Sequence, residues 1–326
     1  MFRTEVHVAP SDLELTLQSK VVTIGSCFAE VIGSKLRQNK VQALVNPFGT
    51  IFNPLSAALL LEAAAGKNYN FEEHLVQNNG IWYAYDLHSS LSSSSSKEEL
   101  LQTIAQRLQQ TKEALREADL LIVTLGTAVG YRLNSTGSVV ANCHKLPSKN
   151  FTRLLLSTEE IAGALEGAYT LLQQFNPKLK VLLTVSPVRH LKETIEINTV
   201  SKSILRVACH QLTAKQEGML YFPAYEIMLD DLRDYRFYKR DMIHPTEEAE
   251  DYIWQKFTTA YFNTNFNTYL QEWEKMQRAL AHKAFHPASE AHQAFLKSTL
   301  KQLQQLQQKY RIDTSAEEEQ LKAQLL

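Results

Sequence analysis

The sequence predicts an α/β protein whose parallel sheet lies between two layers of helices. Apolar runs rich in branched side chains at residues 20–24, 119–125 and 180–185 have the length and composition of buried strands. Segments with helical spacing of apolar residues separate them, and this alternation favours parallel strands joined by right-handed crossovers. Ligands of such sheets bind at the carboxyl ends of the strands, so the residues that follow each strand are the first candidates for a site.

The first strand ends at Gly25, and a helix with Phe28, Ile32 and Leu36 on one face follows at once. Two prolines and a glycine make the segment NPFGTIFNP a loop of defined shape. A serine-rich stretch precedes the longest helix of this half of the chain. The further elements expected here are a strand at 42–45, a helix at 56–65, an extended segment at 80–87 and a helix at about 98–118.

The run at 119–125 is the strongest strand signal, and the segment after it is expected to form a β-hairpin with its turn near 134–137. The remaining elements of this region are helices at 158–175 and 198–217 and strands at 180–185 and 219–222. No internal repeat is evident.

From about Thr246 onward the sequence predicts helix only, with a break at Pro287. Apolar residues share one face on each side of this break, which is typical of a helical hairpin. We therefore expect an α/β domain over residues 1–262 and a C-terminal helical hairpin or arm over 263–326. Such an arm either packs against the main domain or forms a homodimer.

The composition is that of an ordinary globular protein, with 44% hydrophobic and 21% charged residues among 326. Lys and Arg number 34 against 35 Asp and Glu, so no excess of positive charge favours nucleic acid as a partner. No apolar run reaches the ~20 residues of a membrane span, and the first ten residues lack the apolar core of a secretion signal. We expect a cytoplasmic protein.

Three cysteines, Cys27, Cys143 and Cys209, are far apart and form no C-x-x-C pair. A disulfide framework or a structural zinc site is therefore not expected. Cys209 is interpreted as a small buried apolar residue. Cys143 precedes His144, but no pair of residues has metal-ligand spacing, so the sequence predicts neither a metal nor a cofactor.

Ser26 is the first candidate for chemistry because it stands between a buried strand and a helix. Its hydroxyl would lie at the carboxyl end of the strand, near helix amides that could stabilise an oxyanion. The alternative is the common role of serine as a helix N-cap. The neighbouring thiol of Cys27 is a rival nucleophile, but adjacent side chains point in different directions, so only one of the two can face a site.

Asp241 and His244 form the second candidate, in the segment DMIHPT. Their spacing puts both side chains on one side of a turn, where the carboxylate can hold one imidazole nitrogen while the other faces outward. A serine nucleophile needs this combination of base and orienting acid. The alternative is a loop histidine beside an exposed aspartate.

Six segments follow one another along the chain up to about Tyr261: GSCFA, NPFGTIFNP, LGTA, VANCHK, TVSPVRH and RDYRFYKRDMIHP. Together they resemble the blocks of the GSCFA family, a branch of the SGNH or GDSL-like hydrolases. The resemblance implies a three-layer α/β/α, flavodoxin-like fold and ester chemistry. It also implies Ser26 as nucleophile, His244 as base and Asp241 as the residue that orients this base.

In SGNH relatives the oxyanion is held by the amide of the nucleophile, a glycine of the second block and an asparagine of the third. Gly49 fits the second block. The third block contains Gly126 and Thr127, but Ala128 stands where the asparagine is expected, and its side chain cannot donate a hydrogen bond. Thr127, Asn46 or a backbone amide would have to take over this role, or the oxyanion hole is weaker.

Arg189 and His190 follow the strand at 180–185 and are expected on the same edge as Ser26. The guanidinium could bind a carboxylate or phosphate of a substrate, or form an ion pair with the acidic segment YEIMLDDLRD. His190 is a rival to His244 as base, although it lacks a neighbouring aspartate.

These residues predict a serine hydrolase of the esterase type that acts on a small-molecule, glycan or lipid ester, such as an O-acyl or O-acetyl group. Acyl transfer to a hydroxyl is a close variant. The alternative from another class is a binding module for a carbohydrate or acyl group on the same fold, since fold alone does not decide function.

Overall fold

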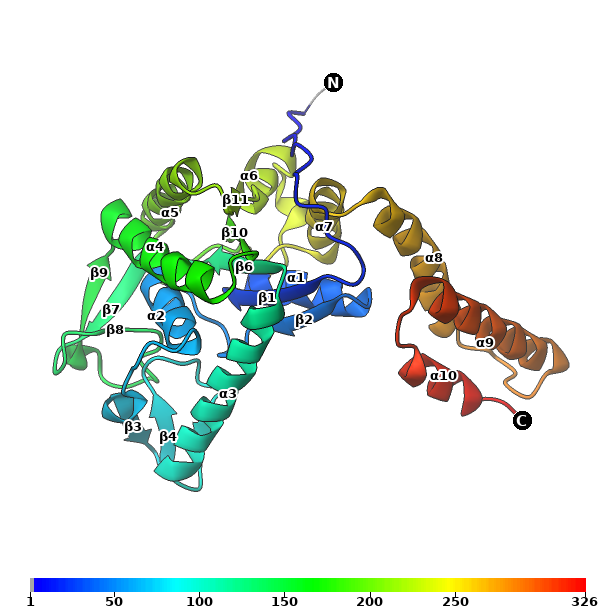
Figure 1. The fold of residues 1–326 in the computed structure, drawn as a ribbon, viewed down its shortest axis with the longest axis horizontal. Coiled ribbons are helices and arrows are strands. Elements are labelled where there is room, and N and C mark those ends of the chain that lie inside the picture. The colour runs from blue at the N-terminus through cyan, green and yellow to red at the C-terminus, as the bar shows by residue number, and fades with distance from the viewer. Residues whose placement is uncertain (1–2) are drawn as a thin grey trace.

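In the computed structural model, which describes residues 3–326, a five-stranded parallel sheet forms the centre of the molecule (Figure 1). Its strand order is β11-β10-β6-β1-β2, and every neighbouring pair is parallel. Numbered along the chain, these five strands have the order 2-1-3-4-5 of flavodoxin-like sheets. The strands are β1 (Lys20–Gly25), β2 (Gln42–Val45), β6 (Leu120–Leu125), β10 (Lys180–Val185) and β11 (Met219–Tyr221).

Helices cover both faces of this sheet, which confirms the predicted α/β fold class. One layer contains α2 (Pro54–Ala64), α3 (Lys97–Glu117), α4 (Thr158–Phe175) and α5 (Ile195–Lys215). The other contains α1 (Cys27–Gln38), α6 (Ala224–Glu226), the single π-turn η3 (Ile227–Asp231) and α7 (Glu247–Tyr261). Across the described residues, no helix combines the length and apolar character that a membrane crossing demands.

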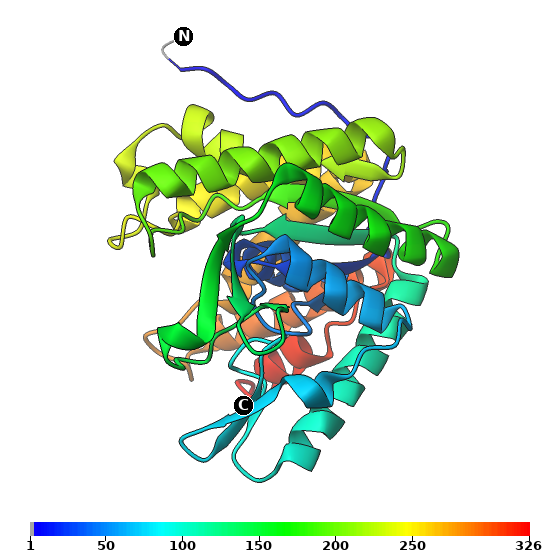
Figure 2. The same cartoon turned by 90° about the vertical axis from the view of Figure 1, so that its left-hand side faces the viewer.

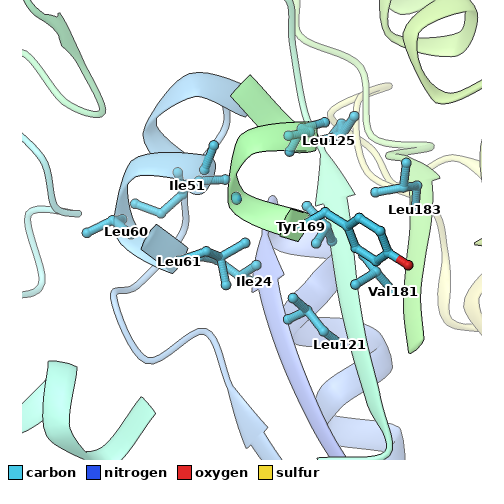
Figure 3. Packing of buried hydrophobic residues seen from close by; sticks show 14 of the residues in the cluster. Ile24, Ile51, Leu60, Leu61, Leu121, Leu125, Tyr169, Val181 and Leu183 are labelled. Atoms are coloured by element: carbon cyan, nitrogen blue, oxygen red, sulfur yellow. The ribbon is translucent and has the colours of Figure 1, made fainter. Parts of the chain in front are cut away.

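Alternating side chains of the central strands supply two separate cores. In β1, Val22 and Ile24 are buried on the side of α2 and α4, whereas Val21 is buried on the side of α1. Figure 3 shows the first core, in which Leu121 of β6, Val181 of β10 and Tyr169 of α4 belong to one cluster of buried side chains. This burial on both faces explains why the strands appear in the sequence as continuous apolar runs.

Two small antiparallel sheets extend the fold beyond the central one. The sheet β8-β7-β9 follows β6 directly and contains the predicted hairpin, but β9 was not predicted because most of its side chains are exposed. Figure 2 looks onto this side of the molecule. The strands are β3 (Leu75–Asn78), β4 (Ile81–Ala84), β5 (Ser92–Ser93), β7 (Val129–Leu133), β8 (Val139–Val140) and β9 (Phe151–Leu155), with the short 3₁₀ turns η1 (Phe71–His74), η2 (Ser148–Asn150) and η4 (Tyr235–Phe237).

The C-terminal helices lie at one end of the molecule, on the right of Figure 1. They pack against the end of α1 and the turn that follows it: the indole nitrogen of Trp273 donates to the carbonyl of Gln38 at 2.8 Å, and Lys40 pairs with Glu317 at 2.6 Å. The structure thus shows packing against the main domain, and the hairpin is followed by a third helix. Dimer formation and a domain boundary at 262/263 stay predictions. The helices are α8 (Thr264–Leu280), α9 (Glu290–Tyr310) and α10 (Ser315–Lys322).

Replacement of Gly25 by alanine tests the tight contact between β1 and β6. Gly25 has φ +138°, and a Cβ there would lie 2.1 Å from the carbonyl oxygen of Thr124. We expect Gly25→Ala to lower the free energy of unfolding by about 3 kcal/mol or more. Urea denaturation measures this change. In the matched control Gly163→Ala, on the open surface of α4, stability should rise by about 0.5–1 kcal/mol. Equal stabilities for the two variants would contradict the proposed contact.

Candidate active site

The candidate site lies at the carboxyl ends of β1 and β6, where the direction of the chain crossovers reverses. β1 leads into α1 on one face of the sheet, whereas β6 leads through β7–β9 into α4 on the other face. Neighbouring helices diverge at such a point, and ligands bind in the opening between them. Three backbone bonds join four segments here: Ser26 N donates to Thr124 O at 3.0 Å, Ile51 N to Gly25 O at 2.8 Å and Ser186 N to Leu125 O at 2.9 Å.

Ser26 is the N-cap of α1, and its extended backbone (φ −68°, ψ 177°) marks the end of β1. Its Oγ accepts a hydrogen bond from the amide of Phe28 at 3.3 Å, and only 2% of the residue is exposed. The amide of Ala29 donates to the carbonyl of Ser26 at 2.8 Å. Among the first-turn amides of α1, that of Cys27 donates to no other residue of the described chain. The cap role is therefore seen directly, and the role as nucleophile stays a prediction.

Asp241 and His244 form a hydrogen-bonded pair in the turn before α7. His244 Nδ1 lies 2.7 Å from Asp241 Oδ2, while Asp241 Oδ1 accepts from the amides of Ile243 at 2.9 Å and His244 at 3.0 Å. The His244 amide, its ring and the Ile243 amide hold the pKa of Asp241 well below its usual value. An ionised carboxylate on Nδ1 assigns the proton to that nitrogen and leaves Nε2 as the free acceptor. Within residues 3–326, no hydrogen bond joins Ser26 Oγ to His244.

Arg189 ties this turn to the edge of the sheet. Its amide donates to Ile243 O at 3.2 Å, its guanidinium donates to Met242 O at 3.0 Å, and the guanidinium carbon lies 3.9 Å from the ring centre of Tyr238. No carboxylate of residues 3–326 lies within 4 Å of this guanidinium, so the alternative of an ion pair with the acidic segment is wrong. A role of Arg189 in substrate binding stays a prediction.

His190 turns to the opposite side of the site from Arg189. Its amide donates to the side-chain oxygen of Asn198 at 2.9 Å, and its ring centre lies 6.2 Å from that of Phe52. Its Nδ1 is buried without a partner among the described residues. Burial, and then the charge of Lys202, lower the pKa of His190. A neutral imidazole without a carboxylate partner lacks the orienting group that His244 has.

The predicted oxyanion donors are all engaged in bonds within the fold. Gly49 N donates to Asn46 O at 2.8 Å, and the amides of Gly126 and Thr127 donate to Phe52 O at 3.0 and 3.1 Å. The hydroxyl of Thr127 is bonded to that of Ser201 at 3.0 Å, and the amide of Asn46 reaches Glu30 at 3.4 Å. An oxyanion at any of these donors would have to share or replace an existing bond. Their roles stay predictions.

Lys202 of α5 is a residue of this edge that the sequence analysis missed. It is 1% exposed, and its ammonium donates to the carbonyls of Gly126 at 2.8 Å and Ser186 at 2.7 Å. It therefore links the ends of β6 and β10. Burial lowers its pKa to about 7. The sequence held a signal: Lys202 occupies the apolar stripe of its helix together with Leu205 and Leu212, where a lysine is unexpected.

The three cysteines are free thiols. Burial raises the pKa of Cys27 and of Cys143, and raises that of Cys209 to about 12, so burial disfavours the reactive thiolate at all three positions. In the part of the chain that the structure describes, no three His, Cys, Asp or Glu side chains are grouped as a metal ion would require.

The fold and the edge residues define a doubly wound α/β protein with a capped serine at its switch point and an aspartate–histidine pair in a turn bonded to Arg189, which follows β10. The chain belongs to the GSCFA family, whose model matches residues 20–257. A second model, described as the C-terminal domain of GSCFA domain proteins, matches residues 273–326. No curated protein matches the chain.

Replacement of Lys202 tests the link between β6 and β10. Lys202→Met leaves two buried carbonyls without donors and is expected to cost about 2–4 kcal/mol of stability at pH 9. The unfolded lysine keeps its proton to about pH 10.4, whereas the folded one loses it near pH 7, so the unfolded state binds more protons between these values. Wild-type stability should therefore rise with pH in this window relative to Lys202→Met.

Urea titrations of both proteins at pH 6, 7.5 and 9 measure this difference. Lys178→Met, an exposed lysine between α4 and β10 with no carboxylate of residues 3–326 within 4 Å, is the control and should show the same pH dependence as the wild type. A stability difference that is constant with pH would show that Lys202 does not change its charge in this range.

Proposed function

We propose that this protein is a serine hydrolase of the esterase type, with an SGNH-like site made of Ser26, His244 and Asp241. The observation that carries the proposal is the position of Ser26 at the switch point of the sheet. Arg189, which follows β10 at the same edge, donates hydrogen bonds to the carbonyls of Met242 and Ile243, in the turn that contains Asp241 and His244. The resemblance of the chain to SGNH hydrolases supports the same assignment. The pair has the geometry of an orienting acid and a general base, which a serine nucleophile needs to lose its proton.

In the proposed reaction, the Ser26 hydroxyl rotates about χ1 from the Phe28 amide toward His244. Nε2 then accepts the hydroxyl proton while Oγ attacks the acyl carbonyl, and Asp241 stabilises the imidazolium. His244 returns the proton to the leaving alcohol. Water repeats these steps on the acyl-enzyme and releases the acid. An acyltransferase differs only in the hydroxyl compound that replaces water.

The Cys27 amide is the donor we propose for the developing oxyanion. It points from the first turn of α1, where the partial positive charge of the helix also favours an anion. It has no bond to another residue that would have to break, unlike the amides of Gly49, Gly126 and Thr127. One preorganised donor in such a site contributes about 3–4 kcal/mol to transition-state stabilisation.

A binding module for an acyl or carbohydrate group is the second candidate. It is favoured by the low exposure of Ser26 and by the engagement of its hydroxyl in the cap. Ala128 in the third block is fully buried, its side chain has no donor and its amide is bonded to Ser201 Oγ at 2.7 Å, which also favours a binding module. In this case the site would hold an ester without cleaving it.

Ser26→Ala separates the two candidates. The substitution removes the nucleophile, so hydrolysis of 4-nitrophenyl acetate should fall to the level of buffer, followed by release of nitrophenolate. Loss of the cap should cost only about 1 kcal/mol of stability. Cys27→Ala, the neighbouring control, should keep its activity. Unchanged turnover in Ser26→Ala would show that Ser26 is not the nucleophile. Loss of activity in Cys27→Ala would assign the role of nucleophile to the Cys27 thiol.

Asp241 and His244 should behave as one unit. Asp241→Asn is expected to lower kcat far more than it changes KM, because the amide favours the wrong imidazole tautomer. His244→Ala should remove most of the rate together with the rise of kcat/KM with pH that deprotonation of a base produces. The double variant should be little slower than His244→Ala alone, since members of a catalytic unit are not additive.

Steady-state kinetics of the three variants over a range of pH measure these effects. Additive losses in the double variant would show that the two residues act separately. A rise with pH that survives in His244→Ala would assign the base to another residue, with His190 the first to test.

A further inference from the structure

A cavity of about 530 Å³ lies beside the candidate site, on the side of His190. Phe52 and Thr127 belong to its wall, and the two are joined by the bond from Thr127 N to Phe52 O at 3.1 Å. Ile51, one residue before Phe52, donates its amide to the carbonyl of Gly25, which directly precedes Ser26. Backbone hydrogen bonds therefore connect the wall that contains Phe52 and Thr127 to the residue before the proposed nucleophile.

The walls of the cavity carry positive charge. Lys145, Arg153 and Lys192 line it, and no Asp or Glu is among its lining residues. Arg153 is paired with Glu193 at 3.2 Å, but no carboxylate of residues 3–326 lies within 4 Å of Lys145 or Lys192. Two cations are thus left without a carboxylate partner around one opening, and a ligand with an anionic group would provide one.

Aromatic rings provide the apolar surface of the cavity. Phe52, Tyr131 and Phe151 line it and are half-buried. The ammonium of Lys192 lies 4.3 Å from the centre of the Tyr131 ring, so that a cation and a ring face share one wall. Such a surface suits a planar ring or a short apolar chain that carries the anionic group.

The turn that carries Lys145 is fixed by contacts outside the cavity. His144 and Lys145 have φ of 48° and 58°, a left-handed conformation that is unfavourable for both residue types. The buried ring of His144 stacks on Tyr83 at 4.6 Å and lies 2.8 Å, through Nε2, from the carbonyl of Ala84. These contacts hold the segment VANCHK in place, with Asn142, Cys143 and Lys145 along the cavity. The unfavourable backbone of this turn is thus maintained by surrounding contacts, and it keeps Lys145 at the cavity wall.

We propose that this cavity binds a carboxylate or phosphate group carried on a ring or short chain, and that this group is part of the ester substrate. The binding itself stands on the charges and rings of the cavity. Only the statement that the ligand is the substrate rests on the proposed function.

The first experiment measures binding without catalysis. Ligand-observed NMR titrations of the full chain with benzoate, phenyl phosphate and benzamide compare the two anions with a neutral ring of similar size. At least one anion should bind about fivefold to tenfold more tightly than benzamide, the scale of one or two charge contacts. The preferred anion identifies the group as carboxylate or phosphate. The preference should weaken as salt is added.

Paired charge variants localise the effect. Lys145→Gln combined with Lys192→Gln should remove the preference for the anion, whereas Lys149→Gln combined with Lys178→Gln, two exposed lysines outside the cavity, should keep it. Equal binding of anions and benzamide by the wild type, or an equal loss in both double variants, would overturn the proposal.

The second experiment compares the hydrolysis of charged and neutral esters in two sets. In the aromatic set, 4-acetoxybenzoate and 4-acetoxyphenyl phosphate carry the anionic group and 4-acetoxybenzamide is the neutral ester. In the aliphatic set, the 4-nitrophenyl monoester of adipate is the anionic ester and 4-nitrophenyl hexanoate the neutral one. In at least one set kcat/KM should be about fivefold to tenfold higher for the anionic ester, and the cavity variant should lose this difference. Cleavage of neutral and charged esters at equal rates would overturn the inference and leave the esterase intact. If no ester is cleaved, the esterase fails, and the binding experiment alone decides on the cavity.

Discussion

The close contact between the ends of β1 and β6 is the constraint on which the candidate site depends. Gly25 brings its backbone against that of Thr124, where no side chain would fit, and the next amide donates to the same carbonyl. The chain can then leave β1 and enter α1 within one residue, which makes Ser26 both the end of a strand and the cap of a helix. Everything proposed for Ser26 follows from this position.

The centre of the sheet could be predicted because β1, β6 and β10 are buried on both faces. Such strands appear as continuous apolar runs, and the helices between them fix the parallel arrangement. β9 could not be predicted in this way, since its exposed side chains leave no apolar pattern. The packing of the C-terminal helices on α1 also depends on contacts between distant residues, such as that of Trp273 with Gln38, which no local pattern reveals.

In the candidate site, too, features that depend on local spacing could be predicted, whereas features that depend on distant contacts could not. The spacing of Asp241 and His244 is local, so their pairing could be derived from the sequence. The engagement of the Gly49 and Gly126 amides depends on the path of the loop between β2 and α2, which brings Phe52 under the end of β6. Lys202 was recognisable as a lysine on an apolar helix face, but its acceptors lie on two other segments. Distant contacts of this kind decide which amides are free for an oxyanion.

Two properties of Ser26 oppose each other in this account. The cap bond uses a lone pair of Oγ and stabilises α1, whereas catalysis requires the same oxygen to donate its proton to His244 and to attack a carbonyl. The energies are compatible, because a cap contributes about 1 kcal/mol and a single rotamer change releases it. A serine in this position can serve both roles, because its oxygen accepts the cap bond while its O–H stays available to donate to His244.

Reaction with a fluorophosphonate, followed by peptide mass spectrometry, tests the central claim most directly. Only a serine activated by a base reacts with such a probe at an appreciable rate, and the modified residue is identified by its mass. The account predicts a single adduct on Ser26 in the wild type and none in His244→Ala. An adduct on another residue, or no adduct in a correctly folded wild-type protein, would contradict it.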